Sequence, residues 1–259
     1  MIPCLLEVLP AVHRVHEPPA APDAEALEDL LRAFGLLESP LRGELASRDV
    51  ARALQRATGQ PIERFVHLAA LRAMRQARYA AESRGHFALA FRHYVHFTSP
   101  IRRYADLVVH RVVKALLAGE AVHLTRAHAA RIAVRVSFRE RQALEAEREV
   151  ADLAKCAFMA HHVGEEVPGT VTGVAPHGLY VTLDPWFVEG LVHVSSLPDF
   201  VVPDELGAAL VAERSGRRYT LGDRLLVRVA KVDQIRARID FEILRVLEQV
   251  ELPGSVARR

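Results

Sequence analysis

The chain has 259 residues, half of them apolar and a quarter charged, with a formal net charge of +2. This composition is typical of a soluble globular protein of one large or two ordinary domains. No run of about 18 apolar residues occurs, which excludes a membrane-spanning helix. The first ten residues lack a basic leader and a small-residue cleavage site, so they do not predict a signal peptide. Cys4 and Cys156 match no metal-ligand spacing and suit a reducing cytoplasm as buried thiols.

Positive charge is concentrated between residues 63 and 103. This stretch holds eight arginines (64, 72, 75, 78, 84, 92, 102 and 103) but only two acidic residues, Glu63 and Glu82. A GC-rich genome accounts for the general preference for arginine over lysine. The local excess of charge instead indicates a polyanionic partner, because the planar guanidinium group is well suited to phosphate.

The first third of the chain reads as helical. Leu27, Leu30, Leu31 and Phe34 form an apolar stripe that Gly35 closes, and Ser47 can cap a helix that Gly59 ends. Pro61 opens a third helix, whose buried side would carry Ile62, Phe65, Val66, Ala69 and Ala73. Arg72, Arg75 and Arg78 form a second stripe on it, for which a solvated helix face is the simpler interpretation.

The middle of the chain predicts an extended segment followed by long helices. Residues 86–97 are rich in aromatic side chains and are expected to be extended. Ser99 and Pro100 fit the N-cap and first position of a helix that runs to about Leu117. A helical region follows from about Thr125 to His162, and Ser137 is a candidate point for a second helix to begin.

The character of the sequence changes near Gly164, where five short runs rich in Val and Leu begin. These runs are residues 169–175, 178–183, 188–194, 225–232 and 238–243. Without long helices between them, they predict a small closed barrel. Residues 198–222 are expected to form a long loop with a short helix, Trp186 and Phe187 to lie in a turn, and the residues after about Leu252 to form a frayed tail.

The segment HFTSPIRRYADLVVHR, residues 96–111, is the most informative one. If Ser99 caps the helix, Arg102 and Arg103 lie in its first turn, where the helix dipole disfavours cations by about 0.3–1 kcal/mol each. An anion held between these arginines and the free backbone N–H groups would remove that cost, and the hydroxyls of Thr98 and Ser99 would add donors. The alternative is that Arg102 pairs with Asp106 while Arg103 points into water. Ile101, Tyr104, Val108 and Val112 would form the buried stripe. Asp106 and His110 either orient neighbouring groups or are satisfied buried polar residues, of which we expect the second.

The same segment resembles the signature of the RNB exoribonuclease family of RNase R and RNase II, with the RNase R branch as the most similar. The resemblance extends to RVHE (14–17), LRAMRQARY (71–79), GHFALAF (85–91) and AEREVADLAKCAFM (146–159), and so covers nearly the whole chain. It implies that Arg102 or Arg103 stabilises charge developing on the scissile phosphate. It also implies that Glu147 lies near the RNA path, and the alternative for Glu147 is a solvated helix face.

The resemblance implies two-metal hydrolysis in which clustered carboxylates hold Mg²⁺. The family's acidic cluster and its RNA-clamping tyrosine lie upstream of the segment that matches here, and Glu28-Asp29 is the only adjacent acidic pair in the first third. We therefore expect the Mg²⁺ ligands to be absent from this chain. A split gene, a truncated reading frame and an incomplete record are alternatives that the sequence leaves open.

The C-terminal runs resemble the RNA-binding OB fold of the ribosomal protein S-one type. The resemblance implies that Tyr180 and His193 lie on a binding face and that Arg238 supplies a backbone contact. A partly buried barrel residue is the alternative for Tyr180, and Trp186 and Phe187 either bind RNA or plug the barrel's end. Base stacking on such a face contributes about 1–3 kcal/mol per base.

Together these features predict an α+β protein. Residues 1–162 would be the helix-rich C-terminal part of an RNB catalytic domain, 163–245 a five-stranded OB barrel, and 246–259 a tail. The expected function is 3'–5' exoribonuclease action on single-stranded RNA in the cytoplasm, releasing nucleoside 5'-monophosphates, with the missing N-terminal half as a possible partner. The alternative is an RNA-binding fragment or remnant without chemistry.

Overall fold

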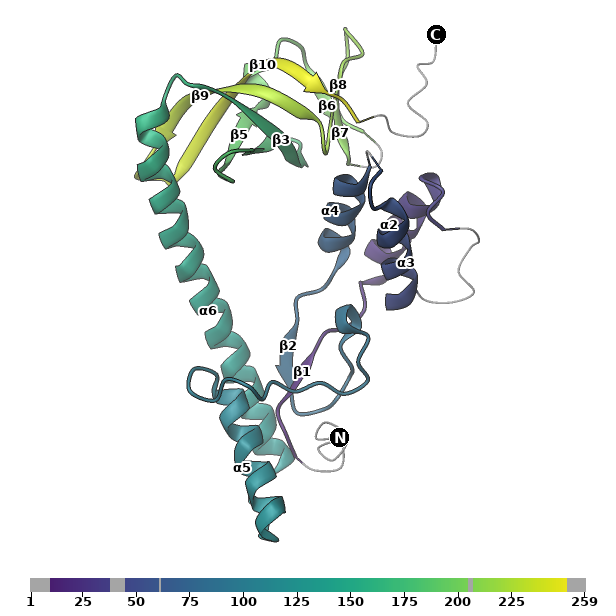
Figure 1. The fold of residues 1–259 in the computed structure, drawn as a ribbon, viewed down its shortest axis with the longest axis vertical. Helices are drawn as coiled ribbons and strands as arrows, with labels where there is room; N and C mark the ends of the chain where they lie inside the picture. The colour runs from purple at the N-terminus through teal and green to yellow at the C-terminus, as the bar shows by residue number, and fades with distance from the viewer. Residues whose placement is uncertain (1–9, 38–44, 61, 205–206, 251–259) are drawn as a thin grey trace. The chain divides into compact units, whose positions relative to one another are not determined.

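The computed structural model describes residues 10–37, 45–60, 62–204 and 207–250 (Figure 1). The predictions for Cys4, Pro61 and the residues after Leu252 concern positions outside these ranges. The chain divides into two compact units that interleave in sequence. The first contains residues 1–28, 39–53 and 70–145, and the second contains residues 29–38, 54–69 and 146–259. No described helix is both long and apolar enough to span a bilayer.

The N-terminal helices form largely as their patterns predict. They are α2 (Ala21–Ala33), α3 (Ser47–Ala57) and α4 (Glu63–Ala73). Gly35 and Gly59 follow α2 and α3 with positive φ, the conformation that a glycine allows at a helix end. The expected arginine stripe on the third helix is wrong, because α4 stops at Ala73. Arg75 lies after the helix and Arg78 lies in a strand.

In the first unit, a short antiparallel pair lies against two helices. The pair joins β1 (His13–Val15) and β2 (Arg78–Ala80), with Arg14 opposite Tyr79. The helices are α5 (Tyr104–Ala118) and α6 (Arg126–Met159). One core cluster joins β2, both helices and the residue before β1. Its buried members are Val12, Tyr79, Ala105, Val108 and Ala133.

Two expectations for the middle of the chain are corrected. Residues 86–97 are not a strand: they hold a 3-10 turn, η1 (Phe87–Leu89), and isolated bridges at His86 and Phe91. α6 is one continuous helix of 34 residues through Ser137, and the turn η2 (Ala160–His162) follows it. The Ser137 hydroxyl is used for a tertiary contact instead of a cap, since it accepts a hydrogen bond from the Tyr79 N–H at 2.9 Å.

The second unit contains the predicted five-stranded closed barrel, with strand order β10-β5-β4-β3-β9. Its strands are β3 (Glu166–Ala175), β4 (Gly178–Leu183), β5 (Glu189–His193), β9 (Arg224–Asp233) and β10 (Arg238–Glu248). Four neighbouring pairs are antiparallel. The β5–β10 pair is parallel and joined by one register pair, Leu191 opposite Asp240.

Inward-facing residues alternate along these strands and fill the barrel, as the period of two requires. The core includes Val181, Leu225, Val227 and Phe241, which are at most 1% exposed. Two glycines allow strands to approach closely. A Cβ atom on Gly178, whose φ is +158°, would lie 2.3 Å from the carbonyl oxygen of Val192, and one on Gly190 would lie 2.5 Å from a Phe241 ring carbon.

The segment from 198 to 222 is not a loop with a helix. It contains a three-stranded antiparallel sheet of β6 (Val201–Pro203), β7 (Ala209–Ala212) and β8 (Arg218–Thr220), and the turn η3 (Val194–Ser196) precedes it. Buried Asp223 supports its return to the barrel by accepting backbone N–H bonds from Thr220 and Val250, each at 2.7 Å. Trp186 and Phe187 do lie at a turn, where Phe187 has a φ of 54°.

Candidate RNA-binding sites

The first candidate site is the turn before α5, which carries Arg102 and Arg103. Ser99 does not cap α5: the carbonyl of Ser99 accepts N–H bonds from Arg102 at 3.3 Å and from Arg103 at 3.0 Å, closing a separate turn. Arg103 then adopts an extended conformation (φ −118°, ψ 109°) as the N-cap residue, and α5 begins at Tyr104. The two arginines therefore precede the helix instead of lying in its first turn, and the predicted conflict with the helix dipole does not arise.

Asp106 holds this turn in place. One of its carboxylate oxygens, Oδ2, accepts the Ser99 N–H at 2.8 Å and the Arg103 Nη2 at 3.0 Å. Asp106 is fully buried, and its other oxygen, Oδ1, has no hydrogen-bond partner among the described residues. The ion pair is thus formed by Arg103, and the alternative in which Arg102 pairs with Asp106 while Arg103 points into water is wrong.

The two arginines consequently differ in exposure and in contacts. Arg103 is only a quarter exposed and also reaches the Thr98 hydroxyl at 3.4 Å, whereas Arg102 is exposed. Ile101, expected in the buried stripe, is fully exposed, and Tyr104 is half exposed. Val108 and Val112 are buried as expected. His110 is a satisfied polar residue, since its Nε2 lies 2.8 Å from the Phe97 carbonyl.

A cluster of aromatic and basic residues that was not expected as a site lies next to this turn. The Tyr79 hydroxyl lies 2.8 Å from His96 Nδ1, and the Arg14 guanidinium lies over the Tyr79 ring at 4.7 Å. Burial, and after it the positive charges of Arg103 and Arg14, lowers the pKa of His96 to about 4. His96 is therefore neutral at pH 7. The family-like segments around Arg14 and Tyr79 were the only signal of this cluster in the sequence.

The second candidate site is a pocket of about 930 Å³ in the second unit. Tyr180, His193 and Arg238, which were singled out on separate strands, all line it. The Tyr180 hydroxyl lies 2.9 Å from His177 Nε2, which fixes the ring, and Tyr180 itself is half-buried. An aromatic ring, an imidazole and a guanidinium at one opening can stack a base and contact a phosphate.

The C-terminal end of α6 also lines this pocket, through Asp152, Lys155 and Cys156. Sequence reasoning found no role for these residues beyond the expected burial of Cys156, which is confirmed. Burial raises the pKa of the Cys156 thiol, which disfavours the reactive thiolate at neutral pH. Glu147 is exposed on the same helix and does not line the pocket.

Trp186 forms a third feature of the second unit. Its ring lies 4.4 Å from the His162 ring and 5.5 Å from the Phe158 ring. These contacts support the alternative in which Trp186 packs at the barrel's end. Phe187, by contrast, is 77% exposed.

No group of three or more His, Cys, Asp or Glu side chains suited to a metal ion occurs in residues 10–37, 45–60, 62–204 and 207–250. The described side chains thus do not fit the paired-metal chemistry that the resemblance implies, and no hydrolytic step can be derived through them.

Comparison with known proteins gives two family matches. Residues 7–119 match the RNB domain, and residues 160–244 match the S1 RNA binding domain. Ribonuclease R of Escherichia coli is 39% identical over 261 residues, covering 96% of this chain and 32% of that protein. Ribonuclease R of Aquifex aeolicus is 40% identical over 246 residues, covering 93% of this chain and 35% of that protein. The chain thus spans about a third of the curated relatives that it matches.

The fold also matches solved structures. Mycoplasma genitalium RNase R, both in its apo form and in complex with ribose methylated single-stranded RNA, aligns with a TM-score of 0.82 at 24% identity. The alignment covers 94% of this chain and 39% of that one. At this identity the match shows that the fold is shared.

Proposed function

Since the chain belongs to the RNB family of RNase R and RNase II and corresponds to a C-terminal portion of these enzymes, we propose that it is the RNA-binding part of a 3'–5' exoribonuclease. The whole enzyme would shorten single-stranded RNA in the cytoplasm and release nucleoside 5'-monophosphates. We further propose that residues 1–162 belong to the catalytic domain, 163–245 to the barrel and 246–259 to a tail. The matched ranges 7–119 and 160–244 support this division.

The observation that carries the proposal is the convergence of Tyr180, His193 and Arg238 on one pocket. In this proposal Tyr180 and His193 stack on bases, and Arg238 contacts the backbone. The relative solved with single-stranded RNA supports RNA as the ligand class.

At the turn before α5, we propose that exposed Arg102 contacts a phosphate at the scissile end. Arg103, held by Asp106 and Thr98, would position that turn. Thr98 and Ser99 would border the phosphate. Glu147 remains a predicted RNA-path residue on α6, supported only by its match to the family's motif.

Mg²⁺ and its carboxylate ligands would come from the part of the enzyme that this chain does not cover. The proposed partner is therefore the N-terminal half of the enzyme, in the same or a separate chain. Alone, the chain should bind RNA without cutting it. An RNA-binding remnant without a catalytic partner is the second candidate, favoured by the missing metal cluster among the described residues.

The first experiment measures binding of a labelled single-stranded oligoribonucleotide to the purified chain by fluorescence anisotropy. Tyr180→Ala should weaken binding by about 1–3 kcal/mol, the contribution of one stacked base. Phe200→Ala is the matched control, because Phe200 is a 68% exposed aromatic residue of the same unit that does not line the pocket. Equal affinities of both variants and the wild type would contradict the pocket as the binding site.

A second experiment follows the length of the labelled RNA over time, with Mg²⁺ and with EDTA. We expect the RNA to stay intact in both. Stepwise, Mg²⁺-dependent shortening from the 3' end would show that the chain holds a metal site of its own and would refute this part of the proposal.

A further inference from the structure

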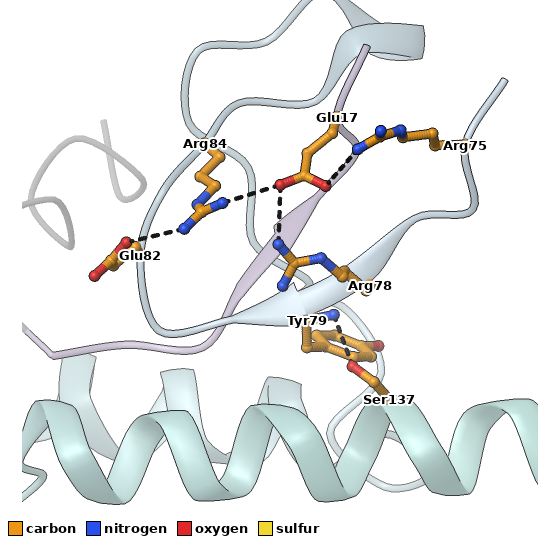
Figure 2. Close-up of polar contacts among 7 residues, drawn as sticks. All are labelled: Glu17, Arg75, Arg78, Tyr79, Glu82, Arg84 and Ser137. Carbon is orange, nitrogen blue, oxygen red and sulfur yellow. Dashed lines mark hydrogen bonds and ion pairs between the residues drawn. The ribbon is translucent and has the colours of Figure 1, made fainter. Parts of the chain in front are cut away.

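Three arginines in the first unit converge on one carboxylate. Glu17, which follows β1, lies 3.0 Å from Arg78 Nη2, 3.1 Å from Arg84 Nη1 and 3.4 Å from Arg75 Nη1. Figure 2 shows the three guanidinium groups around Glu17, with Glu82 beyond Arg84. We call Glu17, Arg75, Arg78 and Arg84 the arginine cluster.

The charges of the arginine cluster do not balance. Glu82 adds a second carboxylate, 3.5 Å from Arg84 Nη2, so two negative charges face three positive ones. The arginine side chains are 41–54% exposed, while Glu17 is 25% exposed. Each guanidinium has five N–H donors, of which the contacts to Glu17 and Glu82 use one or two. Donors and a net positive charge therefore remain open to solvent.

The backbone beneath the arginine cluster is firmly held. Tyr79, next to Arg78 in β2, is buried, and its N–H donates to the Ser137 hydroxyl of α6 at 2.9 Å (Figure 2). Because side chains alternate along a strand, burial of Tyr79 turns Arg78 outward. The hydrogen bond from Arg78 lowers the pKa of Glu17, so the carboxylate stays ionised at neutral pH.

The simplest alternative is a purely structural role, in which an ion pair joins Glu17 to β2. One exposed ion pair contributes about 0–1 kcal/mol, and one arginine would suffice to join Glu17 to β2. The second and third arginines add electrostatic repulsion between like charges, which a structural ion pair does not require. Fixed, solvent-open guanidinium groups around one small anion are instead the arrangement that binds further anions, since each planar fork is suited to a phosphate.

We propose that Arg75, Arg78 and Arg84 form a binding subsite for backbone phosphates of single-stranded RNA, with Glu17 as the positioning residue that fixes their guanidinium groups. This inference rests on the proposed function, because it takes RNA as the ligand. It gives a local role to the positive charge found between residues 63 and 103.

The test compares two variants of equal net charge in the full chain. The first, E17Q/R75Q/R78Q/R84Q, removes the arginine cluster without leaving a carboxylate alone. The control, R131Q/R135Q, removes two exposed arginines of α6 and changes the charge by the same amount. Affinity for a single-stranded oligoribonucleotide is measured over a range of salt concentrations, and far-UV circular dichroism checks the fold.

We expect the first variant to lose about tenfold or more in affinity, the loss expected for at least one charge-assisted hydrogen bond. Its slope of log K against log salt should fall by about 0.7 for each phosphate that the variant no longer binds. The control should change little. Equal changes in both variants, or none in either, would overturn the subsite. A wild-type chain that binds no RNA would instead refute the proposed function.

A single substitution separates positioning from simple charge. Glu17→Gln raises the net charge by one, so electrostatics alone predicts tighter RNA binding. If Glu17 positions the arginines, E17Q binds more weakly despite the added positive charge. Unchanged or tighter binding would overturn the positioning role.

Discussion

Replacing Asp106 with asparagine should loosen the turn that carries Arg102 and Arg103. The substitution keeps the shape of the side chain but removes the charge that Arg103 faces at 3.0 Å. The carbonyl oxygen of the asparagine side chain can still accept the Ser99 N–H. The loss therefore falls mainly on the ion pair.

The magnitude follows from the burial of the two partners. Breaking a fully buried ion pair costs about 3–5 kcal/mol, whereas an exposed helical pair contributes only about 0.2–0.5 kcal/mol. Asp106 is completely buried and Arg103 is 25% exposed, so this pair lies nearer the first case. We expect D106N to lower the free energy of unfolding by about 2–3 kcal/mol.

The assay is a double-mutant cycle of D106N and R103Q by urea denaturation. Far-UV circular dichroism is the first probe. Fluorescence of Trp186, the only tryptophan, is the second, since coincident transitions support a two-state treatment. The control cycle uses D29N and R32Q, because Asp29 and Arg32 form an exposed i, i+3 pair at 3.4 Å. A coupling energy between Arg103 and Asp106 no larger than that of the control would refute the reasoning.

Three further predictions concern single residues. His96 has a folded-state pKa of about 4 against an ordinary 6.5, so the unfolded state takes up the proton first as the pH falls. Stability should therefore decrease from pH 6.5 toward pH 4, less steeply in H96Q; equal urea midpoints for both proteins at every pH would contradict this. Gly190→Ala should destabilise the barrel by about 1–3 kcal/mol by crowding Phe241, seen as a lower midpoint of the tryptophan fluorescence transition. R102A should weaken RNA binding with little change in stability, whereas R103A should reduce both; a stable R103A variant would argue against its structural role.

The barrel was predictable because the residues of each strand alone indicate a strand. Val and Leu recur at every second position in β4 and β9, β3 is rich in Val, and glycine, proline or aspartate separates the runs. The sheet of β6, β7 and β8 was not predictable in the same way. Its strands have three or four residues, too few for a period of two to stand out from a polar loop.

The start of α5 was misplaced for a reason that only the tertiary structure reveals. Ser99-Pro100 is a good local helix start, but Asp106 draws the Ser99 N–H into a separate turn and leaves Arg103 extended. The arginine cluster was likewise invisible, because Glu17 is 58–67 residues away from its partners in the sequence. Local patterns predicted which residue types matter but not which of them meet.

A single register pair joins β5 to β10, and we call this contact the seam of the barrel. Amide hydrogens along this seam should exchange with solvent sooner than those of the longer β3–β4 ladder, because fewer bonds hold it shut. Residues on both sides of the seam line the pocket: Glu189–Leu191 on β5 and Arg238–Glu242 on β10. In the proposed complex, an RNA strand bound in this pocket would contact both sides of the seam, so RNA binding would favour the closed barrel.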